Sequence, residues 1–188
     1  FDQFYSYVPE RVLIILDEAY YEFACEIQDY PDSMNYRHDN VITLRSFSKA
    51  YGLGGIRIGY GFAHDQLIKN LLKVKVPFEP SLLAQVAGMA ALDDGDFLSR
   101  TIILNEKGKK YLKEELELLK VQYISSAANF ITTIWESENR ANSLTENLLK
   151  KGVIVRQLTS FGWPNYIRVS IGLEEENEKF IKSLKEIL

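Results

Sequence analysis

Five consecutive apolar residues, Val12 to Leu16, most strongly constrain the fold of this chain. An unbroken run of this length predicts a strand that is buried on both faces of a parallel sheet. Asp17 and Glu18 follow at its carboxyl end, where open α/β sheets place ligand-binding groups. Two further candidate strands come later, at Val41 to Leu44 and at Ile56 to Phe62. The sequence therefore predicts an α/β fold with functional groups at one edge of a sheet.

Lys49 follows the second predicted strand and stands 32 residues beyond Asp17. A lysine can form an imine with an aldehyde cofactor, and an aspartate can hold a pyridine nitrogen protonated. Pyridoxal phosphate chemistry needs both groups. Ser46 and Ser48 offer hydroxyls, and Arg57 a bidentate fork, to a phosphate. The glycines between Lys49 and Arg57 allow the backbone to approach a bulky ligand closely. These residues together predict a pyridoxal phosphate site.

The motifs that carry these residues resemble those of the fold-type I aminotransferases, and most closely the histidinol-phosphate aminotransferases. The matching residues are the D-E-A-Y run at 17–20, the S-x-S-K run at 46–49, Arg57, the AANF run at 127–130, GVIVR at 152–156 and YIRVSIG at 166–172. Several dispersed motifs in one order are far more specific than any one alone. The resemblance implies an α/β fold in two parts. Part of the pyridoxal-phosphate transferase large domain, with a mixed, mostly parallel sheet, would precede a small α+β C-terminal domain.

The resemblance also implies a role for each matching residue. Lys49 would be the catalytic residue, which forms the imine and moves the proton. The cofactor-binding set would contain Asp17 for the pyridine nitrogen, Tyr20 for the phenolic oxygen and Ser46, Ser48 and Arg57 for the phosphate, beside Lys49 itself. The substrate-binding set would contain Asn129, Arg156 and Arg168, with Arg168 as the principal anion anchor.

The activity implied is transamination of histidinol phosphate with 2-oxoglutarate, in histidine biosynthesis. Similar enzymes leave two alternatives, an aromatic amino-acid aminotransferase and a threonine-phosphate decarboxylase. Members of the family are about twice as long and carry an Asn-Pro-x-x-Pro-Thr-Gly stretch upstream. We therefore expect this chain to be a C-terminal half that is inactive alone, from an enzyme that forms a homodimer. The non-enzymatic alternative is a segment that only binds or dimerises.

The resemblance implies how the chain divides into domains, and hydrophobic periodicity predicts its helices and strands. We expect the large-domain part at residues 1–95, a connecting helix at 96–120 with Asp96 as its N-cap, and the small domain at 121–188. Other expected helices lie at 81–92, 141–151 and 174–188. Expected strands of the small domain lie at 130–135, 153–156 and 166–171.

Composition excludes several other classes of protein. With 46% hydrophobic and 12% aromatic residues, the chain can build a core and is not expected to be disordered. A net charge of −4 argues against a nucleic-acid surface, and no apolar run reaches the ~20 residues of a membrane span. The single Cys25 indicates a reducing, cytoplasmic setting. His38 and His64 are isolated, so we expect no metal site. Surface or structural roles alone are expected for Arg37, Tyr51 and Trp163.

Overall fold

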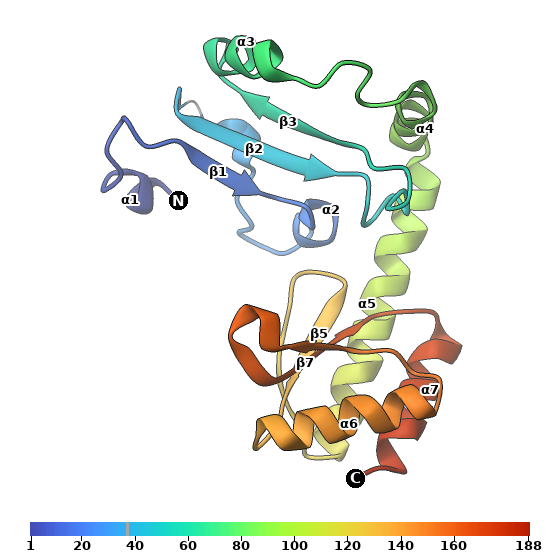
Figure 1. The fold of residues 1–188 in the computed structure, drawn as a ribbon. Coiled ribbons are helices and arrows are strands. Elements are labelled where there is room, and N and C mark those ends of the chain that lie inside the picture. Colours follow the sequence, from blue (N-terminus) through green and yellow to red (C-terminus); the bar gives the residue numbers. More distant parts are fainter. Residues whose placement is uncertain (37) are drawn as a thin grey trace. The chain divides into compact units, whose positions relative to one another are not determined.

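The computed structural model describes residues 1–36 and 38–188, so Arg37 and its expected surface role lie outside the described residues. The chain divides into two compact units, Phe1–Ser99 and Arg100–Leu188. Helix α5 (Gly95–Leu118) runs across the boundary between them (Figure 1). Within the described residues, no helix combines the length and apolar character that crossing a membrane requires.

Unit 1 is built on a three-stranded mixed sheet in the order β1-β2-β3. Strand β1 (Ile14–Asp17) pairs in parallel with β2 (Val41–Ser46), and β2 pairs antiparallel with β3 (Gly59–Ala63). The mixed sheet confirms the expected α/β class. The third strand begins three residues later than the sequence predicted, and it ends one residue later.

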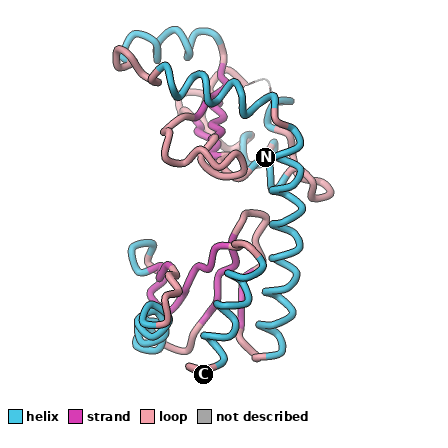
Figure 2. The backbone as a smooth tube through the Cα atoms, turned by 90° about the vertical axis from the view of Figure 1, so that its right-hand side faces the viewer, coloured by secondary structure: helices cyan, strands magenta, loops and turns pink. Residues whose placement is uncertain are grey.

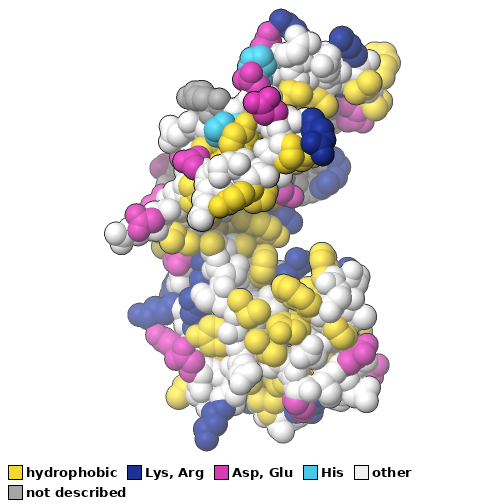
Figure 3. Space-filling model, turned by 90° about the vertical axis from the view of Figure 1, so that its left-hand side faces the viewer, with side chains coloured by type: hydrophobic (Ala, Val, Ile, Leu, Met, Phe, Trp, Pro, Cys, Tyr) yellow, Lys and Arg dark blue, Asp and Glu magenta, His cyan; other side chains and the backbone are white. Residues whose placement is uncertain are grey.

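Burial of β1 differs from the sequence prediction. Ile14 is buried, but Ile15 is 59% exposed and Leu44, on the neighbouring strand, is 41% exposed. The expectation that both faces of this strand are covered was therefore wrong for the described residues. Hydrophobic side chains consequently reach the surface of unit 1, as the space-filling view shows (Figure 3).

Helices and turns of unit 1 connect and flank these strands. They are α1 (Asp2–Tyr5), α2 (Tyr21–Ala24), the 3-10 turn η1 (Ser33–Asn35), α3 (Asp65–Val74) and α4 (Leu82–Asp93). Helix α4 begins where predicted, because the Ser81 hydroxyl accepts a hydrogen bond from Ala84 N–H at 3.2 Å. The predicted cap of α5 was wrong. Asp94, not Asp96, accepts from Phe97 N–H at 2.9 Å, and the helix starts at Gly95.

Unit 2 contains an antiparallel sheet in the order β4-β5-β7-β6. Its strands are β4 (Gln122–Ile124), β5 (Phe130–Ile134), β6 (Arg156–Leu158) and β7 (Trp163–Ser170), and the 3-10 turn η2 (Thr159–Phe161) joins the last two. The predicted strand at 153–156 was wrong except for its last residue. Pairing with β7 begins only at Arg156, opposite Arg168.

The core of unit 2 lies on one face of this sheet (Figure 2). Ile131, Ile167 and Val169 are buried there against α5, α6 (Glu138–Lys150) and α7 (Glu174–Lys185). Side chains alternate between the two faces of a strand. Phe130, Thr132 and Arg168 therefore lie on the other face.

Candidate active site

Asp17 is the last residue of β1, in register with Leu44 of the parallel strand β2. One carboxylate oxygen, Oδ1, accepts a hydrogen bond from Ala19 N–H at 3.1 Å. This contact turns the chain toward Tyr20, which is the N-cap residue of α2. The other carboxylate oxygen retains its acceptor capacity for a ligand.

The chain from Ser46 to Lys49 forms a second turn, at the end of β2. Ser46 Oγ accepts from Ser48 N–H at 3.0 Å. Phe47 within the turn and Ala50 just after it are buried at 4% and 1% exposure and anchor the turn to the core, while Lys49 is exposed. Its Nζ lies 5.2 Å from the centre of the Tyr20 ring. The structure therefore brings Lys49 and Tyr20 together at the edge where β1 and β2 end.

The loop after Lys49 has an unusual backbone at Arg57. This residue adopts φ +60°, in the left-handed region that non-glycine residues rarely occupy, and its Nη1 donates to Gly54 O at 2.6 Å. Gly59, at the start of β3, has no room for a side chain because an added Cβ would lie 2.8 Å from Arg45 O. An observed backbone outlier is a reason to suspect function, and here it concerns the arginine expected to bind phosphate.

Charged side chains that the sequence analysis did not single out lie beside these turns. Arg45 Nε donates to Glu18 Oε2 at 3.0 Å, and both side chains are about nine-tenths buried. The Arg45 guanidinium also lies 3.3 Å from the centre of the Tyr21 ring and 3.4 Å from Asp32 Oδ1. Burial acts to lower the pKa of Arg45, but the hydrogen bond and charge of Glu18 outweigh it, so that pKa is raised. The sequence pointed to Glu18 through its place at the end of the first strand and through the D-E-A-Y match, but it gave Glu18 no individual role.

Glu22 is a second buried acid beside this site. It is 5% exposed, and its Oε2 has no hydrogen-bond partner among the described residues. Burial raises the pKa of Glu22, and the charge of Arg45 only partly opposes that shift. Burial together with the charge of Glu22 raises the pKa of Tyr51 to about 12. A polar, desolvated layer thus underlies the turns that carry Asp17 and Lys49.

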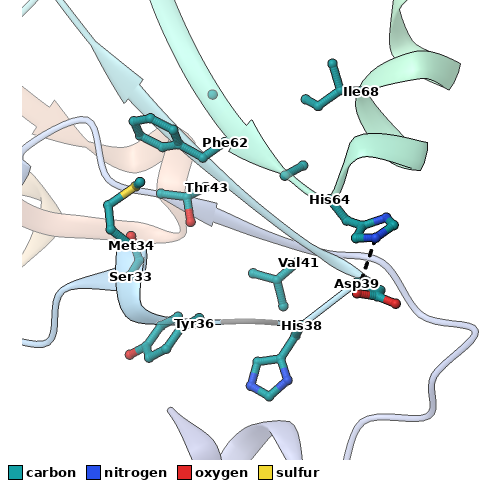
Figure 4. Close-up of a pocket in the computed structure, with 12 residues that line it drawn as sticks. Ser33, Met34, Tyr36, His38, Asp39, Val41, Thr43, Phe62, His64 and Ile68 are labelled. Atoms are coloured by element: carbon teal, nitrogen blue, oxygen red, sulfur yellow. Dashed lines mark ion pairs between the residues drawn. The ribbon is translucent and has the colours of Figure 1, made fainter.

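A hollow of unit 1 lies away from these turns (Figure 4). It has a volume of about 630 Å³ and is lined by Val41 and Thr43 of β2, by Ala63 at the end of β3 and by His64, which follows it. His64 Nε2 lies 3.8 Å from Asp39 Oδ1 at its rim. Ser46 and Lys49 follow the opposite end of β2, so this hollow does not include the predicted cofactor ligands.

Unit 2 brings together two of the three predicted substrate residues. Arg156 of β6 and Arg168 of β7 are direct cross-strand partners and so point to the same face. Arg168 Cζ lies 5.2 Å from the centre of the Phe130 ring. Asn129 precedes β5 and its backbone carbonyl accepts from Ile171 N–H at 2.9 Å. Among the described residues, no carboxylate forms an ion pair with either arginine.

Comparison with known proteins agrees with these features. The model of the family described as aminotransferase class I and II matches residues 3–184. Histidinol-phosphate aminotransferase 2 of Carboxydothermus hydrogenoformans is 43% identical over 189 residues, which cover 100% of this chain and 52% of that protein. Histidinol-phosphate aminotransferase 1 of Nitrosococcus oceani is also 43% identical, over 100% of this chain and 50% of that protein.

A solved structure shows the same fold. Histidinol-phosphate aminotransferase from Sinorhizobium meliloti, in complex with pyridoxal-5'-phosphate, superimposes with a TM-score of 0.91 at 28% identity. The match covers 98% of this chain and 51% of that one. The chain therefore spans about half the length of the curated relatives it matches. These matches confirm the resemblance predicted from the motifs: the chain belongs to the class I and II aminotransferase family.

Proposed function

We propose that this chain supplies the lysine and most of the cofactor ligands of a pyridoxal-phosphate-dependent aminotransferase. Its substrates would be histidinol phosphate and 2-oxoglutarate. The observation that carries the proposal is the placement of Asp17 at the end of β1 and of Lys49 just beyond the end of β2, its parallel neighbour. The names of the relatives, which are 43% identical over the whole chain, support the choice of substrate.

The residues at this edge fit pyridoxal phosphate chemically. Lys49 offers an exposed amine, and the ring of Tyr20 lies beside it. Asp17 keeps a free carboxylate oxygen for a ring nitrogen. Ser46, Ser48 and Arg57 would hold the phosphate. Ser46 accepts from Ser48 N–H and Arg57 donates to Gly54 O, and these contacts leave the hydroxyl hydrogens and the other guanidinium N–H groups available.

Each of these residues would then have a chemical task. Bound pyridoxal phosphate supplies an electron sink for the bond broken in the substrate. Lys49 would hold the cofactor, and its amine would take the proton from the substrate carbon as general base and return one as general acid. Asp17 keeps a proton on the ring nitrogen, because a carboxylate stabilises the charged form of a neighbouring base. Tyr20 donates to the phenolic oxygen of the ring.

The paired arginines of unit 2 are proposed to bind the substrate. Two like charges directly opposite each other on neighbouring strands destabilise a sheet. Arg156 and Arg168 occupy such positions without an ion pair among the described residues. An anion between them would remove that repulsion, and a phosphate or carboxylate matches the guanidinium fork. We assign Arg168 the principal contact and place Asn129 at the same substrate. We further propose a cytoplasmic homodimer as the form of the whole protein.

Chemical trapping tests the proposal. Purified protein is incubated with pyridoxal phosphate and reduced with borohydride, and the labelled peptide is identified by mass spectrometry. We expect the label on Lys49. Label on Lys69 or Lys73 instead would contradict the assignment. The whole protein should then form glutamate from histidinol phosphate and 2-oxoglutarate. Release of CO2 from threonine phosphate, or transfer from aromatic amino acids only, would show that the substrate assignment is wrong.

A further inference from the structure

Arg45 and Glu18 form a buried ion pair that joins the two turns of the proposed cofactor site. Glu18 directly follows Asp17, and Arg45 directly precedes Ser46 and stands four residues before Lys49. The side chains are 9% and 11% exposed, and Nε and Oε2 are 3.0 Å apart. The backbone of Glu18 is fixed as well, because its N–H donates to Leu44 O at 2.8 Å. The two turns are thus linked through both backbone and side chains.

Further contacts hold the Arg45 guanidinium in one orientation. Its guanidinium covers the ring of Tyr21, the neighbour of Tyr20, at 3.3 Å from the ring centre. Asp32 lies 3.4 Å away, and the charge of Arg45 also acts on buried Glu22 and on Tyr60. One cation therefore lies between the carboxylates of Glu18 and Asp32, which would otherwise repel each other. Without it, the Glu18 side chain would lose its charged partner next to Asp17.

A contribution to stability does not by itself explain a buried ion pair, because well-packed apolar residues at the same positions often stabilise a protein at least as much. A charge-assisted hydrogen bond does supply a fixed direction and distance. We propose that Arg45 and Glu18 are positioning residues, which hold Asp17 and Tyr20 in register with Lys49 for the cofactor. This inference rests on the proposed function. It adds residues that touch neither the cofactor nor the substrate but set the geometry of those that do.

The test uses two variants with different structural risk. Arg45→Lys keeps the charge but loses the fork and the flat contact with Tyr21. Glu18→Gln keeps the shape and one acceptor but loses the charge. The matched control is Asp65→Asn, which removes the exposed ion pair with Lys69 on α3. For each protein, three quantities are measured: the melting temperature without cofactor, the Kd for pyridoxal phosphate, and the pH midpoint of the absorbance band of the Lys49-bound cofactor.

We expect both variants to bind pyridoxal phosphate at least tenfold more weakly and to shift that pH midpoint, because Asp17 is no longer held against the ring nitrogen. The rise in melting temperature that cofactor produces should shrink accordingly. Asp65→Asn should match the unchanged chain in all three measurements. If Arg45→Lys does not fold, Glu18→Gln decides the question.

Two results would overturn the inference in different ways. Lower melting temperatures without cofactor, combined with an unchanged Kd and pH midpoint, would show that the pair is purely structural. That outcome leaves the proposed function intact. Absence of borohydride-fixed label on Lys49 in the unchanged chain would instead overturn the proposed function, and this inference with it.

Discussion

At Gly108, α5 packs against the segment that follows β7, and an added methyl group there should destabilise unit 2. The Cβ of an alanine would lie 2.6 Å from Ile171 Cγ2 and 2.8 Å from Asn177 Nδ2. Asn177 is buried, and its amide already donates to Gly172 O and accepts from Gly172 N–H, both at 3.0 Å. Neither neighbour can move without losing packing or hydrogen bonds.

Effects of opposite sign set the change in the free energy of unfolding that Gly108→Ala causes. Helix propensity favours alanine by about 1 kcal/mol. Overpacking a closed contact costs about 2 kcal/mol, and strain on the two amide hydrogen bonds of Asn177 adds about 1 kcal/mol. The free energy of unfolding of unit 2 should therefore fall by roughly 2 kcal/mol. Because Ile171 N–H donates to Asn129 O, the displacement should also reach a proposed substrate residue.

Urea unfolding followed by tryptophan fluorescence measures this effect, since both tryptophans of the chain, Trp135 and Trp163, belong to unit 2. The control is Gly95→Ala in the first turn of the same helix, where an added Cβ meets nothing within 4 Å. The free energy of unfolding of that variant, followed by circular dichroism, should stay within about 0.5 kcal/mol of that of the unchanged chain. Equal stability of both variants would refute the packing argument.

Three further outcomes are expected. Asp17→Asn should lower kcat by about a hundredfold, roughly 3 kcal/mol, while the far-ultraviolet spectrum stays unchanged; near-normal turnover would contradict its role. Arg168→Lys should raise KM roughly tenfold through loss of the bidentate fork, and impaired cofactor retention instead would remove it from the substrate site. Glu22→Gln should change stability with pH. Burial raises the pKa of Glu22, so its favourable contribution is complete below the ordinary carboxyl range and is lost as pH rises through the folded-state pKa. The variant should therefore gain in melting temperature over the unchanged chain as pH rises above the ordinary carboxyl range, and a constant difference would refute this.

Local sequence patterns predicted the elements whose residues carry their own signals. Helix α4 begins at a serine cap, and α7 begins with three acidic residues that favour a helix N-terminus. The strands ending near Asp17 and Ser46 were recognisable as apolar runs, and the spacing of Lys49 from them located the candidate site. These features depend on residues close together in the chain, so they are visible without a structure.

Features that depend on distant pairing were not predictable in this way. The run 153–155 is as apolar as a strand, but only at Arg156 does the chain pair with β7, and the register shifts between Gln157 and Leu158. The Arg45–Glu18 pair joins residues 27 apart, and nothing near either residue indicates it. Burial of Glu22 likewise follows from packing, because an isolated glutamate in a short helix is ordinarily exposed.

The arginines of this chain show how the structure separates positioning from binding. Arg45 is buried and its guanidinium already has carboxylate acceptors in Glu18 and Asp32. Arg57 is exposed and donates to one carbonyl, which leaves most of its five N–H groups for a ligand. Arg156 and Arg168 face each other without a carboxylate partner among the described residues. A guanidinium that the protein has satisfied can only orient its neighbours, whereas one left unsatisfied beside another positive charge favours an incoming anion. The same side chain thus serves opposite purposes, and its acceptors, rather than its sequence motif, decide which.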